Sequence, residues 1–186
     1  MKQETIKKIT FTAVMIALAT VLSVIPAIQL PLGGKTTLAS MLPVMLVVLK
    51  YDFKWGLFTT FLYSVIQMCL SIAKVLSWGL SPLLLVGCIL LDYIFAYTVL
   101  IFAGSFKKHG KAGVIGGVTL ALAARYIMHV ISGMLLWDYV SEMGFWGALW
   151  YSLGYNATYM LPELVLTLII VAALLSTNAY KKIMEY

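Results

Sequence analysis

The sequence predicts an all-α integral membrane protein, and three observations carry that prediction. Of its 186 residues, 62% are hydrophobic and only 11% are charged, whereas soluble domains carry roughly 25% charged residues. The mean hydropathy is +0.99. The hydrophobic residues fall in successive runs near the ~20 residues that an α-helix needs to cross a bilayer. We therefore expect a single transmembrane domain over residues 1–186.

Six apolar runs define the predicted transmembrane helices. They lie at Ile9–Ile28, Thr36–Leu49, Gly56–Ala73, Leu80–Ala103, Gly113–Leu136 and Gly147–Leu175. The first run follows a basic start like that of a signal peptide, but it is too long and lacks a small-residue cleavage site, so we interpret it as a span. The second run is short and contains Pro43, and we expect it to be tilted or broken.

The placement of the lysines predicts the orientation. One side of a six-helix bundle carries Lys2, Lys7, Lys8, Lys50, Lys54, Lys107, Lys108, Lys111, Lys181 and Lys182. Only Lys35 and Lys74 fall on the other side, together with Asp138 and Glu142. Because positive residues favour the cytoplasmic side, both termini are expected there. The lysines lie in short loops and form no continuous basic face, so the net charge of +6 does not indicate nucleic-acid binding.

Polar side chains concentrate in the last three predicted spans. Asp92 is expected near the midplane, with His129, Tyr151 and Asn156 at comparable depth in the outer half. Polar groups in hydrocarbon are costly and usually face a bundle interior or a ligand. Arg125, the only arginine, shares a helix face with His129 and has Asp92 as its natural partner. The cluster predicts either a small-molecule site or, for Arg125 and Asp92, a buried ion pair that locks two helices.

Aromatic residues surround this cluster. Tyr93 directly follows the acidic residue, and Trp137 lies eight residues after His129, on nearly the same helix face. Among aromatic side chains, tryptophan offers the best face for a cation. A carboxylate, an imidazole, phenols, an amide and an indole together suit a planar, cationic heterocycle.

Two other kinds of site, for ATP and for a metal, are disfavoured. The GGKTT segment at 33–37 ends like a phosphate-binding loop, but the position five before Gly34 holds Gln29 where the loop needs a glycine, so we reject ATP binding. Cys69 and Cys88 lack metal-ligand spacing and are interpreted as buried small hydrophobic residues. No metal site is expected.

An intramembrane enzyme is the alternative of a different class. It would use His129 with Ser132 or Asp92 for acid–base chemistry. The sequence shows no recognisable nucleophile turn around these residues. We therefore expect no catalytic residues.

Several segments resemble a known family of membrane proteins. LLDYIFAY (Leu90–Tyr97), ARYIMHVISG (Ala124–Gly133) and YSLGYNATYMLP (Tyr151–Pro162) are similar to the thiamine-specific S-components of energy-coupling factor (ECF) transporters, of the ThiT/YuaJ type. The segment at 30–56 resembles that family's first outer loop and second helix. The resemblance implies a six-helix protein of the bacterial plasma membrane that captures thiamine outside the cell, without a cofactor. It also implies a transmembrane coupling subunit and two ATPase subunits as partners.

The resemblance also implies roles for individual residues. The implied thiamine contacts are Asp92, Tyr93, His129, Trp137, Tyr151 and Asn156. Some relatives have glutamate at the position of Asp92. Arg125, Gly34 and Lys35 are expected to support the site, and the loop at 31–37 is expected to close it, with its glycines as hinges.

Ala13 and Ala17 form an A-x-x-x-A pattern in the first span. Small residues four apart allow close helix approach in lipid, which is equally compatible with packing inside the bundle. The resemblance implies that this face docks on the coupling subunit. Two alternatives remain within transport: a ligand that is a thiamine precursor or related heterocycle, and a proton-coupled transporter acting alone.

Overall fold

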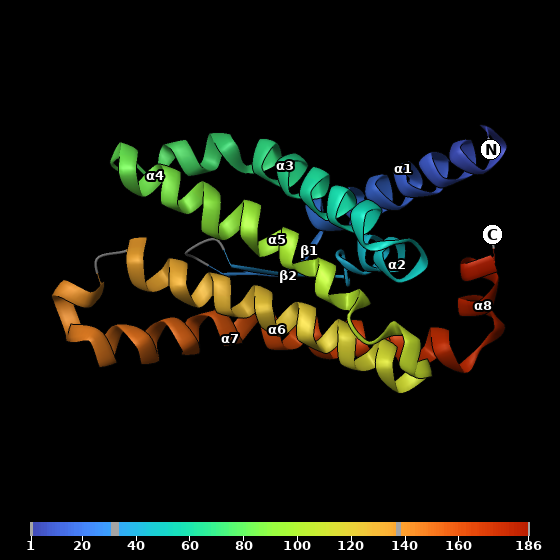
Figure 1. The fold of residues 1–186 in the computed structure, drawn as a ribbon. Helices are drawn as coiled ribbons and strands as arrows, with labels where there is room; N and C mark the ends of the chain where they lie inside the picture. Colours follow the sequence, from blue (N-terminus) through green and yellow to red (C-terminus); the bar gives the residue numbers. More distant parts are fainter. Residues whose placement is uncertain (1, 31–33, 137–138, 186) are drawn as a thin grey trace.

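The computed structural model describes residues 2–30, 34–136 and 139–185, and Figure 1 shows long helices aligned along one direction with both chain ends on the same side. The long helices are α1 (Lys2–Val24), α3 (Phe53–Ser77), α6 (Gly110–Leu136) and α7 (Tyr139–Ser176). The fourth predicted span is one helical run made of α4 (Pro82–Cys88), η1 (Ile89–Phe95), α5 (Ala96–Thr98) and η2 (Val99–Gly104). The shorter elements are β1 (Pro26–Gln29), β2 (Lys35–Thr37), α2 (Leu42–Lys50), η3 (Lys107–His109) and α8 (Asn178–Glu185).

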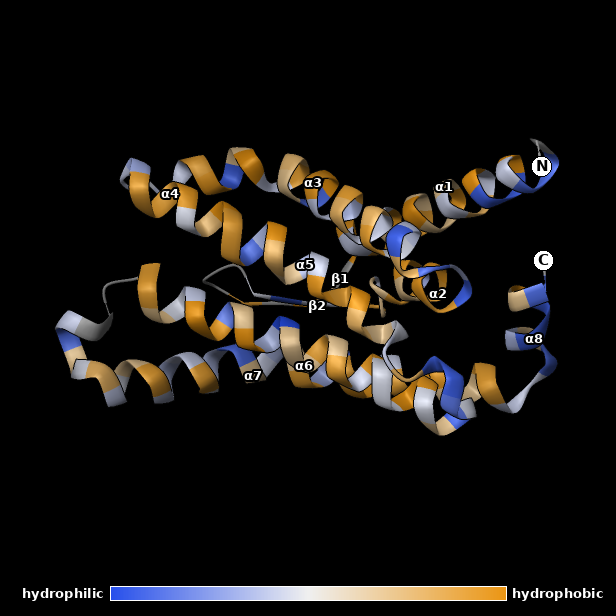
Figure 2. Ribbon diagram, in the orientation of Figure 1, coloured by the Kyte–Doolittle hydropathy of each residue, from blue (hydrophilic) through white to orange (hydrophobic). Residues whose placement is uncertain are grey.

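The predicted fold class is confirmed: the described residues form an all-α membrane bundle, and its helix count and the position of its termini are consistent with the six-helix prediction. The stretches long and apolar enough to cross a membrane are Gln3–Val24, Phe53–Ser77, Pro82–Leu136 and Ser141–Ser176. The third of these contains two helical runs, which are joined by the turn around η3. Figure 2 shows hydrophobic residues along the bundle and hydrophilic ones near the chain ends and in α8.

The second predicted span differs from the expectation. Thr36 and Thr37 belong to strand β2, and helix α2 starts only at Leu42. Its nine residues reach only about 14 Å, too short to cross a bilayer. Pro43 lies in the first turn of α2, where its missing N–H costs no hydrogen bond, so it does not break the helix.

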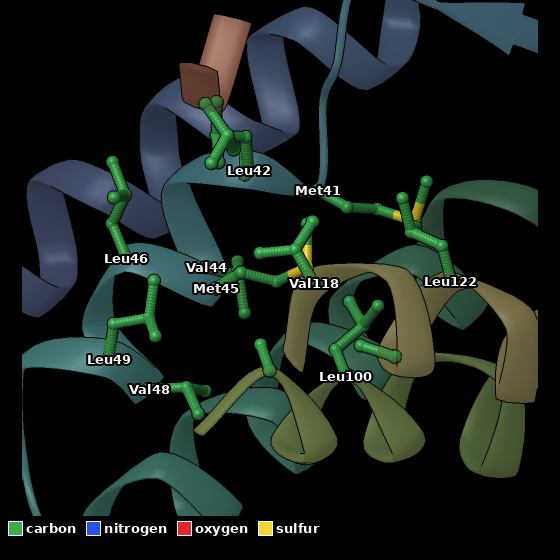
Figure 3. Packing of buried hydrophobic residues seen from close by; sticks show 14 of the residues in the cluster. Met41, Leu42, Val44, Met45, Leu46, Val48, Leu49, Leu100, Val118 and Leu122 are labelled. Carbon is green, nitrogen blue, oxygen red and sulfur yellow. The ribbon is translucent and has the colours of Figure 1, made fainter. Parts of the chain in front are cut away.

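Helix α2 is instead the centre of the hydrophobic core. Every residue from Leu42 to Leu49 is buried. Val44 and Met45 pack in one cluster with Leu100 of η2 and Val118 of α6 (Figure 3). This packing fixes the relative positions of α2, the fourth helical run and α6.

The end of the first predicted span is also not helical. Helix α1 stops at Val24, because a proline at position 26 disfavours helical backbone in the residue before it. Strand β1 then pairs antiparallel with β2, with Ile28 opposite Thr36. The hairpin runs between the side formed by α3 and α5 and the side formed by α6 and α7 (Figure 1).

Two smaller differences concern a cysteine and the last loop. Cys69 is exposed on α3, contrary to the prediction, whereas Cys88 is buried as expected. The segment before the sixth predicted span contains a helical turn from Tyr139, which a kink at Gly144 separates from the rest of α7. Gly144 has φ 71°, a conformation that glycine adopts without steric cost.

Candidate ligand-binding site

A cavity of about 430 Å³ opens between the β1–β2 hairpin and helices α3, η1, α6 and α7. This volume lies within the ~300–1,000 Å³ range of small-molecule sites. The structure brings most of the predicted site residues to its wall: Gly34, Lys35, Asp92, Tyr93, Arg125, His129, Tyr151 and Asn156. Trp137 lies outside the described residues.

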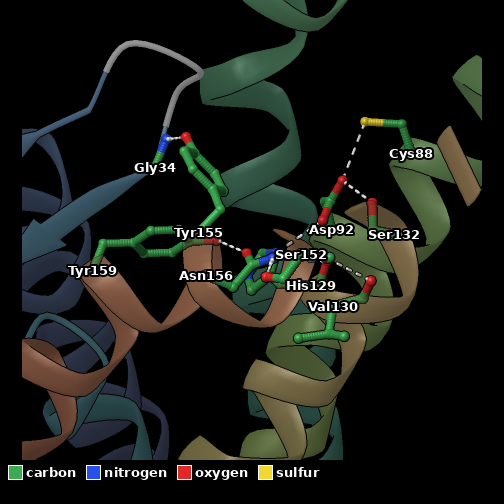
Figure 4. Close-up of polar contacts among 10 residues, drawn as sticks. All are labelled: Gly34, Cys88, Asp92, His129, Val130, Ser132, Ser152, Tyr155, Asn156 and Tyr159. Carbon is green, nitrogen blue, oxygen red and sulfur yellow. Dashed lines mark hydrogen bonds and ion pairs between the residues drawn. The ribbon is translucent and has the colours of Figure 1, made fainter. Parts of the chain in front are cut away.

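Asp92 is the centre of a hydrogen-bond network at this wall (Figure 4). Its Oδ1 lies 2.8 Å from His129 Nδ1, and its Oδ2 accepts a hydrogen bond of 2.5 Å from Ser132 Oγ. Cys88 Sγ, one turn earlier, donates to the same Oδ2 at 3.6 Å. Asp92 sits in the π-helical segment η1, a geometry often found at functional sites. The carboxylate is thus held by donors from two helices.

The expected ion pair between Arg125 and Asp92 is not formed. Asp92 pairs with His129 instead, because His129 stands one turn further along α6, level with the carboxylate. The Arg125 guanidinium lies over the Tyr97 ring, with Cζ 3.8 Å from the ring centroid. Within the described part of the chain, Nε and Nη1 of Arg125 are buried and have no hydrogen-bond partner. Since buried donors are rarely left unpaired, the cavity presents an unused pair of donors.

His129 offers the complementary unpaired atom. Its Nε2 is buried and has no hydrogen-bond partner among the described residues, and the ring lines the cavity. In a neutral imidazole, donation from Nδ1 to the Asp92 carboxylate leaves Nε2 as an acceptor. The site therefore combines a free acceptor with the free donors of Arg125.

One face of α7 supplies an amide and three phenols. Asn156 Nδ2 donates to the Ser152 carbonyl oxygen at 2.9 Å, and Asn156 Oδ1 accepts from the Tyr159 hydroxyl. The rings of Tyr151 and Tyr155 are nearly parallel, 6.4 Å apart between centroids. These flat groups can contact the faces of a ring-shaped ligand.

Sequence reasoning did not assign several residues of the cavity wall to ligand binding. They include Gln67, Tyr97, Ser132, Tyr155 and Tyr159. The tyrosines had a usable signal, because Tyr155 and Tyr159 follow Tyr151 at four-residue spacing and so share its helix face. Gln67 had a similar signal, because Ser71 and Lys74, which also line the cavity, follow it by four and seven residues on α3.

The hairpin closes one side of the cavity. Gly34 N–H donates to the Tyr155 hydroxyl at 3.1 Å, and Lys35 Nζ donates to the Ser23 carbonyl oxygen near the end of α1 at 2.7 Å. Partial burial lowers the pKa of Lys35, and the charges of Arg125 and Lys74 act in the same direction. Of the predicted closing loop at 31–37, residues 31–33 lie outside the described residues.

The predicted docking residues lie on a different face. Ala13 and Ala17 are both exposed on α1. They therefore do not pack inside the described bundle, which was the alternative interpretation of the A-x-x-x-A pattern. Their face remains available in the membrane.

A multi-pass helical bundle with a polar, aromatic-lined cavity defines the class: a membrane protein that binds a small ligand. The family model described as Thiamine transporter protein (Thia_YuaJ) matches residues 9–183, and the chain belongs to that family. It is 30% identical over 180 residues to the thiamine transporter ThiT of Bacillus subtilis (strain 168), covering 89% of this chain and 88% of that protein. A solved structure of ThiT from Listeria monocytogenes shares its fold, with a TM-score of 0.71 and 23% identity over 97% of this chain and 98% of that one.

Proposed function

We propose that this chain is the thiamine-binding S-component of an ECF-type importer in the bacterial plasma membrane. Membership of the thiamine transporter family supports thiamine as the transported ligand. The observation that carries the proposal is the set of unpaired buried atoms in the cavity: the donors of Arg125 and the Nε2 of His129, beside the Asp92 carboxylate. A binding site for a polar heterocycle needs groups of this kind.

The chemistry of thiamine matches this set. Its aminopyrimidine both donates and accepts hydrogen bonds, so it can use Arg125 as a donor and His129 Nε2 as an acceptor. Its thiazolium ring is permanently cationic and is stabilised by Asp92 and by aromatic faces such as those of Tyr93 and Tyr151. Trp137 and Asn156 complete the proposed contacts.

The proposed chain binds its ligand and leaves ATP hydrolysis to its partners. The exposed Ala13 and Ala17 provide a smooth stripe on α1 where a helix of a coupling subunit can approach closely. Two ATPase subunits then supply the energy for release into the cell.

Ligand binding is tested by titrating the detergent-purified protein with thiamine and following tryptophan fluorescence, since Trp78 lines the cavity. We expect a saturable change at one thiamine per protein. Tighter binding of a pyrimidine precursor than of thiamine would instead assign the related-heterocycle function. Mass spectrometry of ligand recovered after incubation separates binding from catalysis, because an enzyme would return a converted product.

Transport is tested in cells that express the chain with and without the coupling subunit and ATPases. The proposal requires that thiamine accumulation depends on them. Accumulation that survives their removal would identify a transporter acting alone.

A further inference from the structure

Glu163 is a buried carboxylate outside the cavity wall whose role the site does not explain. It lies in α7, only 2% exposed, where an unpaired acid would be costly. Its partners come from the hairpin: Oε2 accepts the Thr37 N–H at 2.6 Å, and Oε1 accepts from Thr37 Oγ1 at 2.8 Å. Thr37 Oγ1 also lies 2.7 Å from Ser40 Oγ. The carboxylate thus accepts hydrogen bonds from both donors of Thr37, its backbone N–H and its hydroxyl.

Two further contacts join the hairpin to the same face of α7. The Tyr155 hydroxyl accepts from Gly34 N–H at 3.1 Å, and the Tyr159 carbonyl oxygen accepts from Thr36 Oγ1 at 3.0 Å. Residues 155, 159 and 163 are spaced by four and share a helix face. Between the first and the last, α7 rises about 12 Å, and the strand from 34 to 37 covers about 10 Å. The segment 34–37 therefore lies along this face in register, with Glu163 at its inner end.

The three contacts differ in their relation to the ligand. Gly34, Tyr155 and Tyr159 themselves line the cavity (Figure 4 shows all three), whereas Glu163 is not among the described residues at its wall. Of the three acceptors on α7, only Glu163 is a carboxylate, and hydrogen bonds to ionised groups are the strongest kind. The hydrogen bonds of Glu163 therefore reach the cavity wall through β2.

We propose that Glu163 is a positioning residue for ligand retention: it anchors β2 on α7 so that Gly34 and Lys35 stay in place as one wall of the cavity. Loss of the anchor frees Thr37 and lets this wall move away from the ligand. The effect falls on the rate of ligand dissociation, since no group that touches the ligand is changed. This inference rests on the proposed function for its ligand, but the anchor itself does not.

The first measurement needs no ligand. Hydrogen–deuterium exchange of the full-length protein in detergent is compared for the unaltered chain, Glu163→Gln and the control Glu142→Gln, an exposed acid on the same helix. We expect faster exchange in peptides covering 34–41 for Glu163→Gln alone. The exchange rates of peptides from α3 should be the same in all three proteins. Unchanged exchange at 34–41 would overturn the anchor.

The second measurement follows release of radiolabelled thiamine into excess unlabelled thiamine. Glutamine keeps one acceptor oxygen and loses the charge, so we expect dissociation roughly tenfold faster or more for Glu163→Gln, and no change for the control. Faster exchange at 34–41 with unaltered dissociation would overturn the role in retention. If the unaltered chain bound no thiamine, the proposed function would fail, while the exchange experiment would still decide the anchor.

Two more conservative substitutions, both at Thr37, test the proposal if Glu163→Gln does not fold. Thr37→Val removes the hydroxyl bond to Glu163 and keeps the backbone one, whereas Thr37→Ser keeps both. We expect an intermediate acceleration for valine and a rate near that of the unaltered chain for serine. Equal rates for the two variants would contradict the proposal.

Discussion

Replacing Asp92 with asparagine tests the charge of the site while nearly preserving its shape. In the structure each carboxylate oxygen accepts a hydrogen bond, Oδ1 from His129 and Oδ2 from Ser132. An asparagine keeps one acceptor oxygen, so its NH₂ group must face one of these two donors. The variant therefore disturbs the network and removes a negative charge at the same time.

The two effects differ in size for different ligands. Loss of a hydrogen bond to an ionised group costs about 1.5–3 kcal/mol, and this cost falls on any ligand that uses His129. Loss of the charge matters only for a cation: two unit charges roughly 5 Å apart interact by about 3 kcal/mol at an effective dielectric constant of about 20. That energy corresponds to a factor of about a hundred in affinity. Thiamine should therefore lose about a hundredfold more affinity than its uncharged aminopyrimidine fragment.

Calorimetric titration of both ligands against the unaltered chain, Asp92→Asn and Asp92→Glu measures this ratio. Asp92→Glu keeps the charge and should keep the preference for the cationic ligand, even if the longer side chain weakens both. Equal losses for thiamine and the fragment in Asp92→Asn would refute a role of Asp92 in binding the thiazolium charge.

Three further substitutions test other parts of the molecule. Arg125→Met removes the two unpaired donors, so thiamine affinity should fall roughly tenfold or more; an unaltered dissociation constant in calorimetry would contradict this. A Cβ on Gly34 would lie 2.6 Å from a tyrosine ring of α7, whereas one on Gly154 meets nothing within 4 Å. In thermal unfolding, Gly34→Ala should therefore lose about 1–3 kcal/mol of stability, and Gly154→Ala should not. Ala13→Trp and Ala17→Trp should keep thiamine binding but reduce co-purification with a coupling subunit; lost thiamine binding would place this face inside the fold.

The fold could be predicted because hydrophobic length and lysine placement are local properties of a sequence. The short second helix could not be predicted correctly, because Thr36–Leu49 is apolar whether it faces lipid or protein. Only packing distinguishes the two, and α2 is buried on every side. The strand pairing of the hairpin was missed for a similar reason, since it depends on α7 accepting hydrogen bonds from Thr36 and Thr37.

The site could be predicted as a set of residues but not as a network. Helical spacing placed Arg125 and His129 on one face correctly, yet it gave no means to decide which of them meets Asp92. Asp92 also lies in the π-helical turn η1, which has no clear sequence signal. The pairing with His129 then leaves Arg125 over the Tyr97 ring.

The acidic and basic side chains within the bundle separate into two kinds, and this separation is the strongest argument for a ligand. In Glu163 and Asp92, each carboxylate oxygen accepts a hydrogen bond from the protein, which lowers the cost of a buried charge. Arg125 and His129 retain unpaired atoms, and both face the same cavity. A protein that needed these two side chains only for packing would gain stability by replacing them with apolar ones. Their unpaired atoms are accounted for when a polar ligand supplies the missing acceptor and donor.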